Sequence, residues 1–127
     1  EHLRAAASSG LFDIMAHVDL VKKFGHRPTV DMTDEIQKTA ESFKAAGVAI
    51  EVNSSGLRKP VGEIYPSLDN LIIYCNAGVP LVFGSDSHAP NQVACDFDQA
   101  LALALEAGYK EHVIFEKRKI VAAVGLV

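Results

Sequence analysis

The stretch Val79-Pro80-Leu81-Val82-Phe83-Gly84-Ser85-Asp86-Ser87-His88 joins an apolar run to a short polar tail. The apolar run predicts a short buried strand, and Gly84 permits a turn or a close approach to a ligand. Asp86 and His88 therefore follow the C-terminal end of a strand. If extended geometry continues through them, their side chains point to the same side, about 7 Å apart along the backbone. That spacing suits ligands of one metal ion or of two adjacent ions, although a polar loop in which Asp86 caps the next helix fits the same residues.

Segments of strand-like and helix-like pattern alternate along the rest of the chain. Strands are predicted at residues 11–16, 48–53, 81–84 and 112–116. Helices are predicted at residues 1–9, 32–46, 66–77 and 91–107, and residues 117–127 are left open as a further helix. Strands separated by helices form βαβ units, so the pattern predicts an α/β fold with a parallel sheet.

Polar side chains recur where these predicted strands end. His17 follows the first strand, Glu51 and Asn53 close the second, and Asp86 and His88 follow the third. The carboxyl ends of parallel strands form the ligand-binding edge of α/β folds. Imidazole and carboxylate are the usual ligands of zinc, manganese and iron, so His17, Asp86 and His88 together predict a metal that activates water.

Each of these residues also has an ordinary structural explanation. A single histidine such as His17 can be a hydrogen-bonded polar residue, and Glu51 with Asn53 can form a hydrogen-bonded pair at the end of a strand. Arg58, in the loop after the second strand, can hold an anion such as phosphate through both arms of its guanidinium, or can be a solvated loop charge. His26 and Arg27 are interpreted as loop surface.

Composition excludes several classes of protein. The chain has 127 residues and a net charge of −4, which does not favour a nucleic-acid partner. No apolar run approaches membrane-spanning length. Cys75 and Cys95 have no CxxC spacing, so a reduced pair and a cytoplasmic protein are expected. The chain opens without methionine, inside an amphipathic segment, and we expect it to be the C-terminal part of a longer chain.

Three motifs, taken together and in order, resemble the later motifs of the PHP (polymerase and histidinol phosphatase) family. They are the segments 16–20 (Ala-His-Val-Asp-Leu), 51–58 (Glu-Val-Asn-Ser-Ser-Gly-Leu-Arg) and 84–88 (Gly-Ser-Asp-Ser-His). The Glu-x-Asn segment followed by an arginine is similar to the histidinol-phosphatase branch in particular. The resemblance extends over nearly the whole chain.

This resemblance implies a distorted seven-stranded β/α barrel of the TIM type, with up to three zinc, manganese or iron ions at its C-terminal mouth. It implies a metal-dependent phosphatase that hydrolyses a small phosphate ester, histidinol phosphate, in histidine biosynthesis. The roles that it implies are metal ligation by His17, Asp86 and His88, catalysis by Asp86 and His88, and substrate binding by Arg58, Glu51 and Asn53.

The family's earlier motifs, which begin with a His-x-His, are absent from this chain. Residues 1–127 therefore resemble the C-terminal part of a single barrel domain, and the expected partner is the missing N-terminal part or a second copy. No membrane and no nucleic acid are expected as partners. Two alternatives stay open: another phosphoesterase of this family, acting on a nucleotide, a nucleic-acid end or phosphotyrosine, and a non-catalytic half-barrel that serves interaction.

Overall fold

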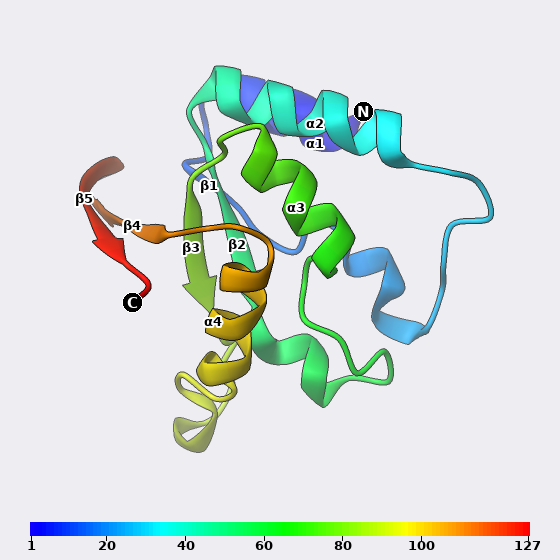
Figure 1. Cartoon of the computed structure of the whole chain (residues 1–127), viewed down its shortest axis with the longest axis vertical. Coiled ribbons are helices and arrows are strands. Elements are labelled where there is room, and N and C mark those ends of the chain that lie inside the picture. Colours follow the sequence, from blue (N-terminus) through cyan, green and yellow to red (C-terminus); the bar gives the residue numbers. More distant parts are fainter.

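The computed structural model describes all residues, 1–127, as a small parallel sheet with helices on one side and a separate hairpin at its edge (Figure 1). The parallel sheet has the order β1-β2-β3 and the hairpin pairs β4 with β5. The strands are β1 (Ile14–Met15), β2 (Ala49–Asn53), β3 (Leu81–Gly84), β4 (Glu111–Glu116) and β5 (Lys119–Gly125). The predicted α/β class and the parallel pairing of the first three strands are confirmed.

Four α-helices and three short 3-10 turns connect these strands. They are α1 (His2–Ser8), the turn η1 (Leu20–Phe24), α2 (Thr33–Ala46), the turn η2 (Ser54–Arg58), α3 (Leu68–Asn76), the turn η3 (Pro90–Gln92) and α4 (Phe97–Glu106). Each of the three parallel strands is followed by a 3-10 turn. These turns give the chain short, compact loops at the C-terminal edge of the sheet.

The start and end of α2 show how the sequence sets its helices. The Asp31 carboxylate accepts a hydrogen bond from the Thr33 amide at 2.8 Å, which satisfies one of the free donors of the first turn. Acidic residues follow in that turn, where they favour the positive end of the helix dipole. Gly47, with φ of 71°, then ends the helix in the left-handed conformation that glycine adopts without strain.

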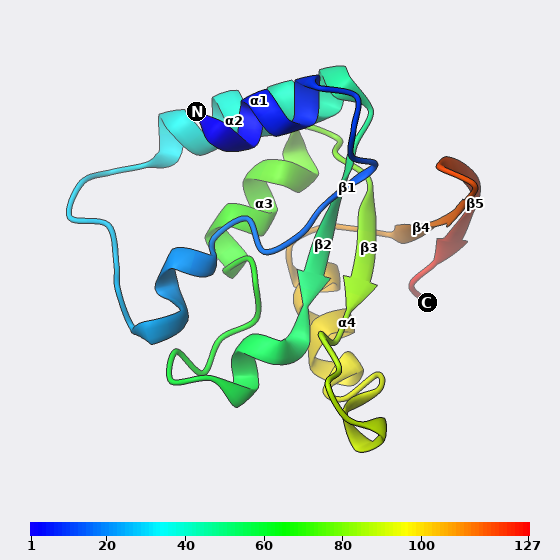
Figure 2. The same cartoon turned by 180° about the vertical axis from the view of Figure 1, so that it is seen from behind.

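The core lies between the parallel sheet and helices α2 and α3. Ile50 of β2 and Leu81 of β3 are fully buried, and Phe43 of α2 stacks on Tyr74 of α3 with ring centroids 5.5 Å apart. Figure 2 shows the opposite side, where β2 and β3 lie in front of α3 and α4 and no helix covers them. One face of the sheet is therefore packed and the other is free of helices.

The C-terminal segment differs from its prediction. Residues 117–127, left open as a helix, form β5, and β4 pairs with β5 in antiparallel fashion instead of extending the parallel sheet. Lys117 and Arg118 both have positive φ, 47° and 69°, which is the geometry of a tight two-residue hairpin turn. Arg118 fastens the turn to Asp13 with an Nε–Oδ2 distance of 3.0 Å. The prediction of a fourth parallel strand was wrong.

Two further elements are shorter than predicted. Helix α4 begins at Phe97 and not at residue 91, because Ala94 and Asp96 have left-handed φ values of 56° and 60° that no helix can contain. Strand β1 has only two residues, each paired with β2, and Leu11 of the predicted strand is 72% exposed. No helix in the structure is long and apolar enough to cross a membrane. Cys75 and Cys95 are both free thiols, as expected.

Candidate active site

The carboxyl ends of the three parallel strands bring three of the predicted side chains together. His17 follows β1, Glu51 lies in β2, and Asp86 follows β3. His17 Nδ1 lies 3.7 Å from Glu51 Oε2, and His17 Nε2 lies 3.8 Å from Asp86 Oδ2. The imidazole therefore has one carboxylate facing each of its nitrogens. All three side chains are partly exposed, so the cluster opens to solvent.

Two of these residues adopt a backbone conformation that is uncommon for residues with a side chain. His17 has φ of 53° and Asp86 has φ of 47°. Such left-handed conformations cost free energy and persist where the surrounding structure enforces them, most often at functional sites. Their occurrence on both sides of Glu51 marks the strand ends as the strained part of the parallel sheet.

Gly84 is required by the position of Glu51. Asn53 pairs with Gly84 across β2 and β3, and the Glu51 carboxylate lies over the glycine. A Cβ built on Gly84 would overlap Glu51 Oε1. The Asn53 amide donates to Glu51 Oε2 at 3.0 Å and fixes the carboxylate from its other side. The predicted Glu51–Asn53 pair is thus present, and it orients Glu51 toward His17.

His88 lies apart from this cluster. The left-handed φ of Asp86 ends the extended geometry, so the predicted alignment of Asp86 with His88 is wrong. His88 is exposed, and its Nδ1 lies 2.8 Å from the Asp86 carbonyl oxygen. The structure contains no group of three or more His, Cys, Asp or Glu side chains arranged to hold a metal ion.

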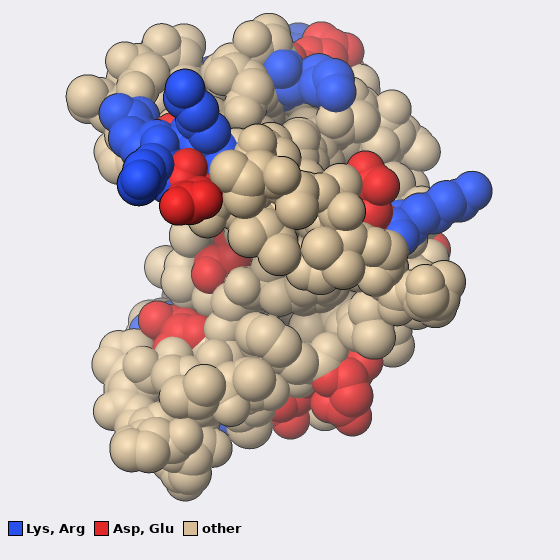
Figure 3. Space-filling model, turned by 90° about the vertical axis from the view of Figure 1, so that its left-hand side faces the viewer, with Lys and Arg blue, Asp and Glu red and all other residues tan.

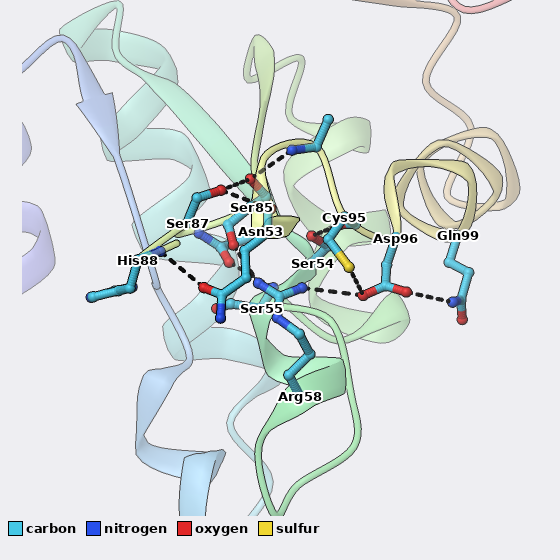
Figure 4. A network of polar contacts seen from close by, with 12 residues as sticks. Asn53, Ser54, Ser55, Arg58, Ser85, Ser87, His88, Cys95, Asp96 and Gln99 are labelled. Carbon is cyan, nitrogen blue, oxygen red and sulfur yellow. Dashed lines mark hydrogen bonds and ion pairs between the residues drawn. The ribbon is translucent and has the colours of Figure 1, made fainter. Parts of the chain in front are cut away.

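The loop that carries Asp86 is held by a polar network (Figure 4). The Ser85 and Ser87 hydroxyls lie 2.7 Å apart, and the Ser85 hydroxyl accepts a hydrogen bond from the Ala94 amide. The Ser87 hydroxyl donates to the Gln92 carbonyl oxygen at 2.7 Å. These bonds tie the Asp86 segment to the turn η3 and the residues after it, and they stabilise the strained backbone of Asp86.

Arg58 belongs to the same network. Its Nη1 donates to Asp96 Oδ2 at 3.1 Å and its Nη2 donates to the Ser85 carbonyl oxygen at 2.6 Å (Figure 4). The guanidinium thereby links η2 to the segment that carries Asp86 and to the start of α4. Each terminal nitrogen retains one further hydrogen, so these bonds leave donors free for the predicted phosphate contact.

Sequence reasoning missed a second polar cluster beside the first. Lys22, only 4% exposed, lies 3.0 Å from Asp19, 2.9 Å from Glu63 and 2.8 Å from the Ile64 carbonyl oxygen. Arg27, interpreted as free loop surface, pairs with Glu63 at 2.8 Å. The pattern around residues 20–30 is irregular and basic, and nothing local in it reveals partners some forty residues away.

Replacing Glu63 by glutamine is expected to lower the free energy of unfolding by about 1 kcal/mol at pH 7, the upper range for partly exposed ion pairs. The hydrogen bond from Arg27, and after it the one from Lys22, hold the pKa of Glu63 at about 2, against burial that acts to raise it. A lowered carboxyl pKa stabilises the fold above the ordinary value of 4.5, and this contribution is lost as the pH falls toward 2.

Urea unfolding of the full-length protein and of Glu63→Gln at pH 7 and at pH 2.5 measures this effect. The difference between the two proteins should shrink at the lower pH. Glu41→Gln, which removes an exposed carboxyl that contacts only Gln37, is the matched control and should change stability little at either pH. An equal difference at both pH values would contradict the assignment of the effect to the Glu63 charge.

Two comparisons with known proteins each found a protein whose name describes a histidinol phosphatase. The chain is 39% identical over 119 residues to a "Probable histidinol-phosphatase" of Deinococcus radiodurans, a match that covers 93% of this chain and 44% of the relative. A crystal structure from Listeria monocytogenes, described as a "putative histidinol phosphatase", superimposes with a TM-score of 0.60 and 25% identity over 68% of this chain and 35% of that one. No family model matches the chain.

These matches confirm the resemblance to histidinol phosphatases that the three motifs predicted. The matched region contains all three strand ends of the parallel sheet, since it extends over 93% of the chain. The matched regions cover less than half the length of either relative.

Proposed function

We propose that this chain supplies part of the active site of a metal-dependent phosphoric monoester hydrolase whose substrate is histidinol phosphate. The observation that carries the proposal is the position of the His17 imidazole, with one carboxylate facing each of its nitrogens, at the carboxyl ends of three parallel strands. The names of the two relatives supply the substrate. A cytoplasmic location is part of the proposal and rests on the two free thiols.

The donor atoms at the carboxyl ends of the three parallel strands are of the kinds that bind a divalent metal. There are too few of them to hold the metal alone. Imidazole and carboxylate are ligands that zinc, manganese and iron share. His17 and Asp86 lie within reach of each other, and the Nε2 of His88 has no partner, because its contact with the Asp86 carbonyl uses Nδ1. We propose that these three residues share the binding of up to three ions with ligands from a further part of the protein, with His88 taking part through its free Nε2 although it lies apart from His17 and Asp86 in this structure. Such a metal would supply charge neutralisation at the phosphate and a more acidic water.

The residues of this chain would then have separate tasks. The strained backbones of His17 and Asp86 hold both side chains in fixed positions. Little reorganisation of these side chains is then needed when a ligand binds. Glu51, fixed by Asn53 and by the absence of a side chain at Gly84, keeps the imidazole oriented. The unused hydrogens of the Arg58 guanidinium are available to an ester phosphate, while its existing bonds hold the Asp86 segment in place.

The surfaces that the chain leaves open support a larger barrel. β1 has a partner on one side only, and the face of β2 and β3 in Figure 2 carries no helix. Figure 3 shows the side of the molecule on which the β4–β5 hairpin lies, and much of that face carries no charged residue. The exposed apolar side chains of the hairpin are Ile114, Ile120, Val121 and Val124. We propose that the remainder of a distorted β/α barrel, or a second copy of this chain, covers these surfaces.

Phosphate release by the full-length protein tests the proposal. Histidinol phosphate should be hydrolysed with a kcat/KM at least about tenfold above that for a 5′-nucleotide, a phosphorylated nucleic-acid end or a phosphotyrosine peptide. Preference for one of these other esters would make the protein a phosphoesterase of different specificity. Absence of release from every ester would favour the non-catalytic alternative.

A further inference from the structure

The side chain of Asp96 makes contacts that differ from those usual for its place in the chain. Asp96 is the residue before α4, where an aspartate side chain commonly accepts a hydrogen bond from the helix's own amides, but here it makes no such bond. Its carboxylate instead accepts from Arg58 Nη1 at 3.1 Å and from Gln99 Nε2 at 3.3 Å (Figure 4). The charged partner of Asp96 is therefore a side chain that lies 38 residues earlier in the chain.

The backbone around Asp96 is fixed without the help of its carboxylate. The Ala94 amide donates to the Ser85 hydroxyl at 3.1 Å, and the Cys95 carbonyl oxygen accepts from the Ser54 hydroxyl at 2.6 Å. These two bonds attach the residues before Asp96 to the residues that follow β3 and β2. The carboxylate consequently has a defined place beside Arg58, and its removal leaves both attachments intact.

Two bonds set the orientation of the Arg58 guanidinium. Nη1 donates to Asp96, and Nη2 donates to the carbonyl oxygen of Ser85, the residue immediately before Asp86. Because the guanidinium is planar and rigid, two such contacts fix both its position and its plane. The side chains of Arg58 and Asp96 are each 26% exposed, so a solute can reach the guanidinium. The carbonyl contact places the guanidinium next to the Asp86 segment of the proposed site.

We infer that Asp96 is a positioning residue whose carboxylate holds the Arg58 guanidinium in the orientation in which its unused hydrogens bind a phosphate oxygen. The inference rests on the proposed phosphatase function and adds a residue that lies in none of the three motifs. Without the Asp96 carboxylate, the guanidinium keeps only its bond to the Ser85 carbonyl oxygen and can turn about it. Phosphate binding must then also order the arginine side chain, which lowers the affinity.

Calorimetric titration of inorganic phosphate into the metal-loaded, full-length protein tests this role. Asp96→Gly removes the carboxylate and suits the left-handed backbone of this residue, which has φ of 60°. It should weaken phosphate binding about tenfold, close to the lower end for a hydrogen bond to a charged group. Loss of a negative charge alone would act in the opposite direction and strengthen phosphate binding. Asp98→Asn, the matched control, makes the same change of charge on an exposed side chain and should leave the affinity within twofold of the wild type.

A double-mutant cycle with Arg58→Ala separates positioning from a general structural effect. In the Arg58→Ala protein, Asp96→Gly should change phosphate affinity less than twofold, since no guanidinium remains to be positioned. A tenfold effect in both backgrounds would overturn the inference, and so would unchanged or tighter binding by Asp96→Gly alone. If Asp96→Gly does not fold, Asp96→Asn removes the charge, keeps the size of the side chain and should weaken binding in the same direction, with equal or tighter binding again as the contradicting result.

Because phosphate is the probe, the outcome does not depend on hydrolysis of histidinol phosphate. A loss of phosphate affinity that requires Arg58 would support the inference even if the wild type hydrolysed no histidinol phosphate. Hydrolysis by the wild type without this coupling would remove the inference and leave the proposed function standing. A metal-loaded wild type that binds no phosphate would also overturn the inference.

Discussion

Asp86→Asn in the full-length protein is expected to reduce kcat/KM for histidinol phosphate at least about 100-fold, because even residues one layer behind a metal ligand cost 10- to 100-fold. The substitution removes the carboxylate charge that faces His17 Nε2 and keeps the size of the side chain. Asparagine also tolerates the left-handed backbone that Asp86 adopts, so the loop should keep its conformation.

Steady-state kinetics and the melting temperature should be measured on the same preparations. Asp98→Asn is the matched control, since Asp98 is an exposed acid in the first turn of α4 with no contact to the cluster. We expect normal activity in the control and a melting temperature near the wild-type value in both variants. Retention of more than half of the activity by Asp86→Asn would show that Asp86 is not an active-site residue.

Gly84→Ala is expected to destabilise the fold by about 1–3 kcal/mol, the usual cost of forcing extra atoms into a packed site. The new methyl group would overlap the Glu51 carboxylate, which cannot turn away without giving up its hydrogen bond from Asn53. Because Glu51 faces His17 Nδ1, its displacement should also disturb the imidazole and lower activity.

Urea unfolding and phosphatase kinetics of Gly84→Ala measure the two effects. In Gly125→Ala the new methyl group would meet only the Val127 carbonyl oxygen, at 3.3 Å, on an exposed strand far along the chain. That control should change neither stability nor activity by much. A fully active, stable Gly84→Ala protein would show that Glu51 does not depend on the space above Gly84.

The parallel part of the fold could be predicted from sequence because its signals are local. Apolar runs bounded by glycine marked β2 and β3, and the helical period with a terminal glycine marked α2. The rule that strand ends meet at one edge then predicts that His17, Glu51 and Asp86 lie together. The distances of 3.7 Å between His17 and Glu51 and 3.8 Å between His17 and Asp86 confirm this prediction.

Backbone conformation limited the rest of the prediction. Left-handed φ values at Asp86, Lys117 and Arg118 cannot be read from the sequence, because only a few per cent of residues other than glycine adopt them. The first of them turned His88 away from the expected alignment, and the other two produced a hairpin in place of a parallel strand. The burial of Lys22 was also hidden, because its partners depend on the packing of a distant loop.

The most direct test of the account is the metal content of the full-length protein, measured by elemental analysis beside a His17→Ala variant. The account predicts bound zinc, manganese or iron, up to three ions per chain, with at least one ion lost in the variant. The melting temperature of the variant should show that it is folded. A metal-free wild-type protein that nevertheless hydrolyses histidinol phosphate would contradict the claim that His17, Asp86 and His88 bind metal.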